Sequence, residues 1–537
     1  MGRAANMSRP PTDAIPAATP VPGRSDEPVP PADRRPPTWL AVSSVAIGAL
    51  ILASWIFLAV AHADDRYRLD HVSGARIALA RSAQEGVLYP ELFDGERYGG
   101  TRFMPLPFVA HGLVAGITDE YLLSGKLLAY AATLGLLATM VVALRRVRCP
   151  TPLQILLPAL VLTTPTALSA SMNLRADVLP LVLQLLAVVL VTGGERTSVV
   201  IVAGVLAALA LFTKTTALWA PLAIVVWLLF RGRGRLGWFI ASYVGSSVAL
   251  LLAFIVASDG RIVENVLGLA ASGVDAGSIV LAPYRLIHLL VSDATPAWAI
   301  LPLAGVVVWL ASIERRASIY VVGLAFAVLV LLVVLTDVGT GWNQLIDVVV
   351  LAAIVTGELA GRVDADGELA GRVDAPTRTE GGRHRLGAVI VGVALLWIST
   401  VGLVVTLVPD VRATIGGELD SRAIPLQGLA DADTAILSED PYVPVSLGQP
   451  PVVLDPFMLL RLGRDRPEAV QELIARIRSQ EFELVVLVQP LEPLDRSWWN
   501  EEHFGSDVVG AIDRAYRFAG RVEGYYLYEP RNEALAP

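Results

Sequence analysis

The chain has 537 residues, of which 54% are hydrophobic and only 17% are charged, whereas an average soluble domain is about 25% charged. A mean hydropathy of +0.59 excludes an ordinary soluble enzyme and indicates that most of the chain lies in lipid. The net charge of −8 is unevenly placed, because residues 409–537 carry 22 of the 50 acidic and 12 of the 42 basic residues. The single cysteine, Cys149, excludes an internal disulfide and a cysteine-based metal cluster.

The N-terminal residues 1–38 contain ten prolines and almost no large apolar side chain. Such a segment cannot bury enough surface to fold, so we expect a disordered cytoplasmic tail. The apolar run Trp39–Ala61 follows, and its 23 residues are enough to cross a hydrocarbon core of about 30 Å. Ala61-His62-Ala63 resembles a signal-cleavage site, but the run exceeds the roughly 7–15 residues of a signal h-region, which favours a retained span.

Ten further apolar segments give eleven predicted spans in all. They are 121–144, 151–171, 178–194, 198–213, 217–230, 236–257, 294–311, 319–336, 344–357 and 386–408. The short arginine-rich loops alternate so that all fall on one side, which the positive-inside rule makes cytoplasmic. We therefore expect a multi-pass protein of the cell (plasma) membrane, with the tail 409–537 on the outer face. The cytoplasmic loop 358–385 holds most of a tandem GELAGRVDA duplication, typical of a loop that tolerates insertion.

The first outer loop, residues 62–104, gathers carboxylates and arginines directly after the first span. We expect an amphipathic helix from Asp70 to Gln84, and later a re-entrant apolar stretch at 104–118. A carboxylate of this loop can act as a general base while an arginine such as Arg102 holds phosphate oxygens. The pattern suits a lipid-phosphate substrate, and the alternative is a solvated loop with ordinary interfacial charges.

The two lysines of the chain both lie at outer helix ends. Lys126 begins the second span, where its amine can snorkel to the headgroups or contact a ligand. Lys214 forms the tip of a predicted hairpin, 198–230, whose two arms are each short for the bilayer. Because a lysine at membrane depth requires a wet or protein-walled cavity, Lys214 is a candidate for phosphate binding.

Other polar residues end later outer turns. Arg175 and Asp177 follow the third span, where they can pair as a helix cap or line a cavity. Asn343 and Asp347 are four residues apart at the start of the tenth span, so one helix face presents both. That face is turned either to the same cavity or to a neighbouring helix.

The tail 409–537 differs in kind, because short β-rich runs alternate with amphipathic helical stretches. The strands are expected at Ala435–Ser438, Phe482–Val488 and Tyr525–Tyr528, and the helices at Pro467–Ser479 and Asp507–Tyr516. This pattern predicts a small extracytoplasmic α/β domain. No sustained basic patch argues for nucleic acid as a partner.

In the order and sidedness of these motifs, residues 39–408 resemble the GT-C superfamily of integral-membrane glycosyltransferases, which includes aminoarabinose and protein O-mannosyl transferases. The matching motifs are Asp70 followed by an amphipathic helix and Gly-x-x-Tyr ending at Tyr89, Arg102-Phe-Met-Pro, Lys126, Arg175-x-Asp177, Leu-Phe-Thr-Lys ending at Lys214, and the late outer turn with Asn343. The chain departs from the commonest pattern because Asp70-His71 stands in place of a paired Asp-Glu.

The resemblance implies a polytopic helical enzyme that moves a hexose or pentose from a polyprenyl-phosphate donor to a lipid or glycan acceptor, with inversion. It implies that Asp70 is the general base, with Asp64 and Asp65 as rivals. The donor phosphate would be bound by Arg102, Lys126 and Lys214. The cavity would be lined by His71, Tyr89, Arg175, Asp177 and Asn343. The carboxylates and histidines near Asp70 could hold a divalent metal, although no ligand set stands out.

Two other classes of protein fit the same composition. A transporter or flippase of a lipid-linked or anionic substrate would also place polar residues inside spans. Transporters commonly contain repeated halves, and the sequence shows no such symmetry beyond the tandem duplication. The third reading is a membrane-anchored glycan-binding protein whose working part is the tail 409–537.

Overall fold

The computed structural model describes residues 37–268, 276–292, 317–337, 341–370, 378–419, 433–492, 503–522 and 524–531, with a few isolated positions between them. The predicted disordered tail, apart from its last two residues, and nearly all of the predicted span 294–311 lie outside the described residues.

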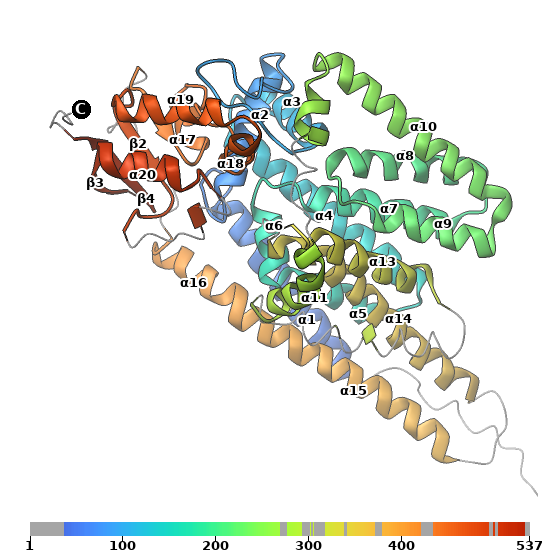
Figure 1. The fold of residues 1–537 in the computed structure, drawn as a ribbon. Helices are drawn as coiled ribbons and strands as arrows, with labels where there is room; N and C mark the ends of the chain where they lie inside the picture. The colour runs from blue at the N-terminus through green and yellow to red at the C-terminus, as the bar shows by residue number, and fades with distance from the viewer. Residues whose placement is uncertain are drawn as a thin grey trace, which may run out of the picture.

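Helices that coincide with predicted spans make up the body of the molecule (Figure 1). They are α1 (Thr38–Ala61), α4 (Tyr121–Arg146), α5 (Thr151–Leu162), α6 (Pro165–Met172), α7 (Val178–Gly193), α8 (Thr197–Thr213), α9 (Trp219–Arg231), α10 (Arg233–Ala257), α13 (Ile319–Val334), α14 (Ile346–Ala370) and α15 (Arg378–Gly402). Short helices precede α14 and extend α15, namely η2 (Trp342–Leu345), η3 (Leu403–Leu407) and α16 (Val408–Gly416). Two further helical segments were not predicted, η1 (Val263–Gly268) and α11 (Ala276–Ser292).

Five of the described helices are long and apolar enough to cross a membrane, and α5 with α6 makes a sixth candidate. This pair is bent by 77°, where the chain passes through Thr163 and Thr164 into Pro165 at the start of α6. Proline is suited to a first helical turn because its missing N–H has no partner there. The shorter apolar helices α7, α8, α9 and α13 stand where spans were predicted, so the count of eleven stays a prediction.

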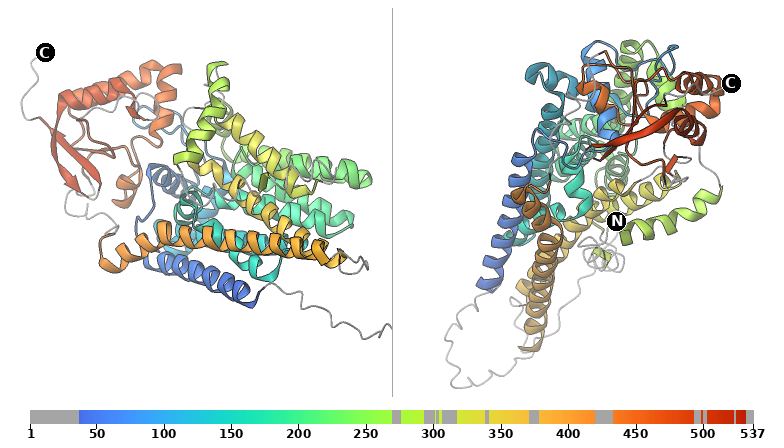
Figure 2. Two further views of the ribbon diagram at one scale, coloured as in Figure 1. Left: turned by 90° about the horizontal axis from the view of Figure 1, so that it is seen from below. Right: turned by 90° about the vertical axis from the view of Figure 1, so that its left-hand side faces the viewer.

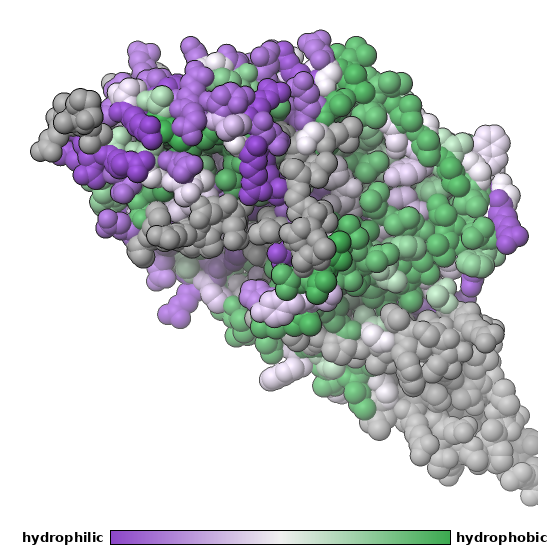
Figure 3. Space-filling model, in the orientation of Figure 1, coloured by the Kyte–Doolittle hydropathy of each residue, from purple (hydrophilic) through white to green (hydrophobic). Residues whose placement is uncertain are grey.

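The surface of the helical body is suited to lipid. On α10 the side chains of Trp238, Val248 and Val256 are exposed, while α8 packs closely against the same helix. The close packing depends on Gly204 of α8, because a Cβ there would lie 2.0 Å from the Ser242 hydroxyl of α10. Figure 3 shows hydrophobic side chains over this part of the molecule and hydrophilic ones over the tail. The two surfaces thus separate a lipid-facing body from a water-facing end.

The predicted loop 358–385 is wrong in part, because α14 continues to Ala370 and α15 begins at Arg378. The first duplicated copy contains Glu358, Leu359, Ala360 and Arg362, which are good helix formers and extend the span as helix. Glu358 and Arg362 form an i,i+4 ion pair at 2.6 Å that supports this extension.

The first outer loop folds largely as predicted. Helix α2 (His71–Gln84) confirms the amphipathic helix, and α3 (Pro105–Thr118) takes the place of the re-entrant stretch. These two helices pack together so closely that a Cβ on Gly112 of α3 would lie 2.6 Å from the Ala80 carbonyl oxygen. The first loop and the segment after it therefore form a folded helical pair at one end of the body.

The tail contains a four-stranded sheet in the order β1-β2-β4-β3. Its strands are β1 (Ile436–Ser438), β2 (Leu484–Leu487), β3 (Tyr516–Val522) and β4 (Tyr525–Pro530), and its helices are α17 (Tyr442–Ser446), α18 (Pro456–Asp465), α19 (Pro467–Arg478) and α20 (Ser506–Ala515). β1 and β2 run parallel, and the other two pairs are antiparallel. The three predicted strands and two predicted helices are present, whereas β3, α17 and α18 were missed.

The sheet and its helices lie against the first loop, as both views of Figure 2 show. Tyr98 bridges to Val453, with main-chain hydrogen bonds of 2.8 Å on either side. Gly74 of α2 faces the tail directly, because a Cβ there would lie 1.9 Å from Oδ1 of Asp440. Side chains of α2 and of the sheet, such as Ile77 and Leu484, share one hydrophobic core. The first loop and the tail are thus one packed unit.

Candidate active site

Asp70 is the N-cap of α2 and the partner of an arginine from another part of the chain. Its Oδ1 accepts hydrogen bonds from the main-chain N–H of Ser73 (2.9 Å) and from the Ser73 hydroxyl (3.0 Å). Its Oδ2 lies 2.5 Å from both Nε and Nη2 of Arg175. Burial by itself raises the pKa of Asp70, but the charges of Arg175 and His71 and these hydrogen bonds outweigh it and hold the pKa below its usual value.

The turn between α6 and α7 places Arg175 and Asp177 against different partners. Ala176 has a left-handed backbone with φ 57°, and the main-chain N–H of Arg175 donates to Oδ1 of Asn173. Arg175 reaches Asp70, whereas Asp177 receives the Lys214 ammonium at 2.6 Å. The predicted Arg175–Asp177 cap is therefore wrong, since each residue pairs with a partner on a different element.

Asp177 is the meeting point of three helix ends and is only 4% exposed. Besides Lys214 from the α8–α9 turn, the side-chain amide of Asn343 donates to its other carboxylate oxygen at 3.1 Å. Asp347, one turn further, accepts from the indole N–H of Trp219 at 2.9 Å. Asn343 thus contacts Asp177, and Asp347 contacts Trp219 of a neighbouring helix, so the common cavity stays a prediction.

Arg76 is the functional candidate that the sequence reasoning passed over. Its side chain is 7% exposed on α2, and its Nε and Nη1 have no hydrogen-bond partner among the described residues. The guanidinium lies over the Phe103 ring at 4.6 Å. Burial lowers the pKa of Arg76 to about 10, with Asp177 and Asp70 acting against Arg175, so it stays charged at neutral pH. The available signal was an arginine within the apolar stretch Ala75–Ala80.

Among the charges gathered here, one cation is left without a carboxylate in contact. We call Asp70, Arg76, Arg175, Asp177 and Lys214 the Arg175 cluster. Two of its cations contact the two carboxylates, and Arg76 has no carboxylate in contact. A buried cation without a partner is costly unless an anion joins it, so the arrangement is suited to binding an anionic ligand.

A second group of charges surrounds the end of α1. Asp65 pairs with His62 and accepts from the main-chain N–H of Tyr67 at 2.8 Å. The Lys126 ammonium is fully buried and donates to the Tyr67 carbonyl oxygen at 2.7 Å, so the snorkelling interpretation is wrong. Asp64 beside them is exposed.

Helix α16 closes this second group. Asp410 bonds the Tyr67 hydroxyl and lies 2.5 Å from Nη2 of Arg68. We call His62, Asp65, Tyr67, Arg68, Lys126 and Asp410 the Lys126 cluster. Its two carboxylates face two permanent cations, and its lysine is occupied by a main-chain oxygen.

The remaining predicted site residues contact the tail or the loop itself. Arg102 lies over the Phe457 ring of α18 at 4.1 Å and 4.0 Å from Asp337, which also pairs with Arg461 at 3.4 Å. Tyr89 is fully buried, and its hydroxyl donates to the Phe103 carbonyl oxygen at 2.8 Å. Arg102 is therefore shared with the tail, and Tyr89 shapes the loop.

His71 lies at the contact between the first loop and the tail. Its ring is 4.3 Å from that of His503, which stacks on Trp498 at 4.2 Å. Beneath them, the fully buried Glu439 accepts from the Trp498 indole at 3.0 Å and from the main-chain N–H of Val488 at 2.7 Å. Burial, with His503 adding to it, lowers the pKa of His71 to about 3, so this imidazole is neutral at physiological pH. The tail thus contacts the residue that follows Asp70 in the sequence.

A metal site is not evident in the part of the chain that the structure describes. No group of three or more His, Cys, Asp or Glu side chains is placed there to hold an ion.

Comparisons with known proteins identify the fold. Neither a protein-family model nor the sequence of a curated protein matches the chain. The apo crystal structure of ArnT from Cupriavidus metallidurans matches with a TM-score of 0.55 at 13% identity, over 91% of this chain and 97% of that one. The same protein bound to undecaprenyl phosphate matches with a TM-score of 0.55 at 14% identity, over 93% and 99%.

An archaeal structure matches as well. The oligosaccharyltransferase of Archaeoglobus fulgidus in the apo form gives a TM-score of 0.52 at 10% identity, over 92% of this chain and 74% of that one. At identities this low, the likeness establishes the fold.

Proposed function

The chain has the fold of the GT-C membrane glycosyltransferases, and from this fold and the Arg175 cluster we propose that it transfers a sugar from a polyprenyl-phosphate donor to a cell-envelope acceptor on the outer face. The observation that carries the proposal is the buried guanidinium of Arg76, whose Nε and Nη1 have no hydrogen-bond partner among the described residues, beside the Asp70–Arg175 and Asp177–Lys214 pairs. A phosphate monoester or diester supplies the anion that this arrangement lacks. The Cupriavidus protein of the same fold was solved with undecaprenyl phosphate bound.

In the proposed reaction, an acceptor hydroxyl attacks the anomeric carbon while the bond from that carbon to the phosphate oxygen breaks. The hydroxyl proton passes to Asp70, and the electron pair leaves with the polyprenyl phosphate, so the configuration at carbon inverts. Negative charge grows on the departing phosphate, where Arg76, Arg175 and Lys214 stabilise it. The transferred group is a hexose or pentose, and no metal is required for this balance.

Arg175 connects the two halves of this chemistry. In the free protein it occupies Asp70 Oδ2 with two N–H groups, which makes the carboxylate a weak base. A donor phosphate competes for the same guanidinium, so its binding releases Asp70 and raises the basicity of the carboxylate. Asp70 thus becomes an effective base when the donor is in place.

The test is transfer by the purified full-length protein, with labelled polyprenyl-phosphate hexoses and pentoses as donors and cell-envelope lipid and glycan extracts as acceptors. We expect one donor to be consumed by the natural protein and by Asp64→Asn, but not by Asp70→Asn. Asparagine is also a good N-cap, so Asp70→Asn should fold and insert normally. Consumption of no polyprenyl-phosphate sugar by the natural protein, with every acceptor fraction present, would rule the proposal out.

A further inference from the structure

A second unpartnered group lies at the opposite end of the helical body, where α4 and α7 end and α13 begins. Tyr320, in the first turn of α13, is 2% exposed, and its hydroxyl has no hydrogen-bond partner among the described residues. The Thr192 hydroxyl of α7 lies beside it but outside hydrogen-bond geometry, and it donates instead to the carbonyl oxygens of Val188 and Val189. A buried hydroxyl without an acceptor is unfavourable unless a ligand supplies one.

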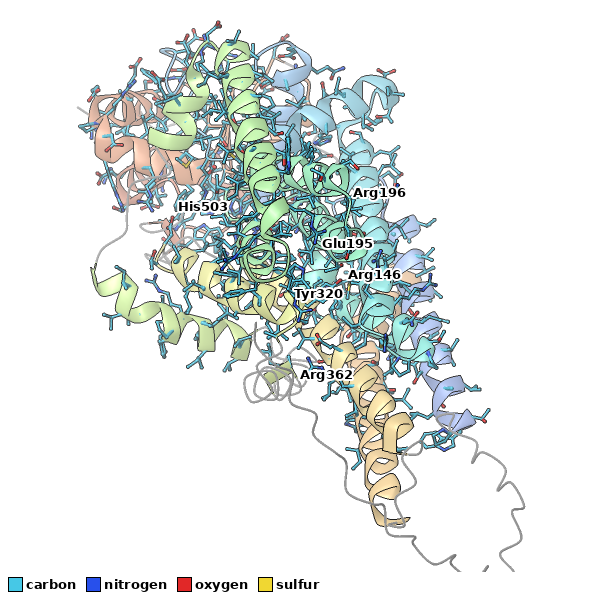
Figure 4. The ribbon with its side chains drawn as sticks, turned by 90° about the vertical axis from the view of Figure 1, so that its right-hand side faces the viewer. Arg146, Glu195, Arg196, Tyr320, Arg362 and His503 are labelled. Atoms are coloured by element: carbon cyan, nitrogen blue, oxygen red, sulfur yellow. The ribbon has the colours of Figure 1, made fainter. Side chains whose placement is uncertain are left out.

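Arg146 is the cation next to this hydroxyl. Its guanidinium lies flat on Gly193 of α7, where a Cβ would meet Nη2 at 2.1 Å, so only glycine permits this placement. Arg146 is exposed and has no ion pair or hydrogen bond through its side chain in the described part of the chain. Figure 4 shows Arg146, Glu195 and Tyr320 gathered at this end, with Arg196 and Arg362 around them and His503 across the molecule.

The nearby acid does not compensate Arg146. Glu358 is nearly buried, and its two carboxylate oxygens accept from the Ser318 hydroxyl (2.5 Å) and from Arg362 (2.6 Å). Glu195 forms no salt bridge among the described residues, and the adjacent Arg196 offsets its charge. An arginine and a tyrosine hydroxyl are thus both available to one anion.

The surface above Arg146 indicates what kind of molecule carries that anion. Leu134 and Val142 of α4 are exposed apolar side chains on a helix long enough to span the membrane. Arg146 follows Val142 by four residues and so ends the same helix face. A hydrocarbon chain lying along this face brings its headgroup to the guanidinium, on the side that the arginine-rich loops predict to be cytoplasmic.

We propose that Arg146 and Tyr320, with Gly193 as the floor, bind the headgroup phosphate of an anionic phospholipid of the cytoplasmic leaflet. The guanidinium pairs with the phosphate oxygens, and one of these oxygens accepts the Tyr320 hydroxyl as the guanidinium moves aside. This site is at the far end of the body from the Arg175 cluster, so it does not depend on the proposed glycosyl transfer.

The test compares thermal unfolding and native mass spectrometry of the full-length protein in nanodiscs of phosphatidylcholine with and without phosphatidylglycerol. We expect phosphatidylglycerol to raise the Tm and to be retained by the natural protein and by Arg145→Gln. Arg145 is the matched control, because it carries the same charge in the same helix turn but donates to Gln154. Arg146→Gln should lose at least half of the Tm increase and most of the retained lipid.

Tyr320→Phe provides the second measurement. In phosphatidylcholine the variant should be as stable as the natural protein or more so, because it removes an unpartnered hydroxyl. In phosphatidylglycerol it should gain less Tm than the natural protein. Equal responses of the Arg145 and Arg146 variants would mean general surface attraction and would overturn the site. An equal Tm increase from inorganic phosphate alone would overturn the assignment to a lipid.

Discussion

The Arg175 cluster and the Lys126 cluster both include residues of the first loop, but they differ in how their charges are paired. In the Lys126 cluster, the two carboxylates match the two permanent cations, and the lysine is held by the Tyr67 carbonyl oxygen. In the Arg175 cluster, the buried Nε and Nη1 of Arg76 have no hydrogen-bond partner in the described part of the chain. We infer that a cluster whose charges are all paired holds elements together, whereas one with an unpaired buried cation is suited to a ligand.

Replacement of one acid in each cluster should give the largest difference in transfer rate. We expect Asp70→Asn to lower the transfer rate by about 10²–10⁴-fold, the usual contribution of a general base. Asp65→Asn should leave the rate of the folded enzyme nearly unchanged and lower its Tm, because it breaks the buried contact with His62. Transfer rates and thermal unfolding of both purified variants check this, and inactivity of Asp65→Asn with an unchanged Tm would reverse the assignment.

Removal of the unpartnered cation should separate activity from stability. Arg76→Met is expected to lower transfer by about 10²–10³-fold, the cost of losing one donor at a developing negative charge. Its Tm should be unchanged or higher, because a buried charge without a partner is removed. The matched change Arg68→Met, in the balanced cluster, should lower the Tm and spare the rate.

Substitutions of the two lysines compare the same two clusters, with smaller expected effects on transfer and stability. Lys126→Met leaves the buried Tyr67 carbonyl oxygen without its donor and should cost about 1–3 kcal/mol of stability, with the rate of the folded protein preserved. Lys214→Met should reduce transfer and weaken the binding of polyprenyl phosphate. Thermal unfolding and a direct lipid-binding measurement distinguish the outcomes, and weaker lipid binding in the Lys126 variant alone would contradict the division into two clusters.

The smallest expected effect is a displacement of the pH profile. Arg175 holds the pKa of Asp70 below its usual value, so the pair stabilises the fold above the unfolded pKa of about 3.9 and is lost as the pH falls through the lowered native value. Arg175→Gln should therefore move the acid limb of the pH–rate profile to higher pH. An unmoved limb would show that another group titrates there.

Local sequence patterns predicted much of the fold but less of the candidate site. The cap at Asp70 and the helix to Gln84 follow from residues close in sequence, as do the strands around Ile436 and Leu484. The sequence also grouped Asp177, Lys214 and Asn343 on the outer side, where the structure joins them. These features depend on periodicity and on the sidedness of loops, which a single sequence displays.

Contacts between segments that are distant in sequence could not be predicted from such local patterns. The sequence places Lys126 at a membrane surface, whereas in the structure its ammonium donates to the Tyr67 carbonyl oxygen. Arg76 stands out only because, among the described residues, its buried Nε and Nη1 have no hydrogen-bond partner. The contact of His71 with His503 joins the first loop to the far end of the chain, and no local signal specifies it. Long-range partners decide which charges are free to react.

The union of the first loop with the tail has a consequence for the order of assembly. Arg66 bonds Tyr525, a residue 459 positions later, and Asp440 accepts from the same tyrosine at 2.5 Å. During synthesis the loop emerges long before its partner strand exists, so these contacts form only after the residues around Tyr525 have been made. A chain that stops before this strand can contain every described helix of the body and still lack the packed unit of first loop and tail. Synthesis of the tail is thus required before the first loop can take its final packing.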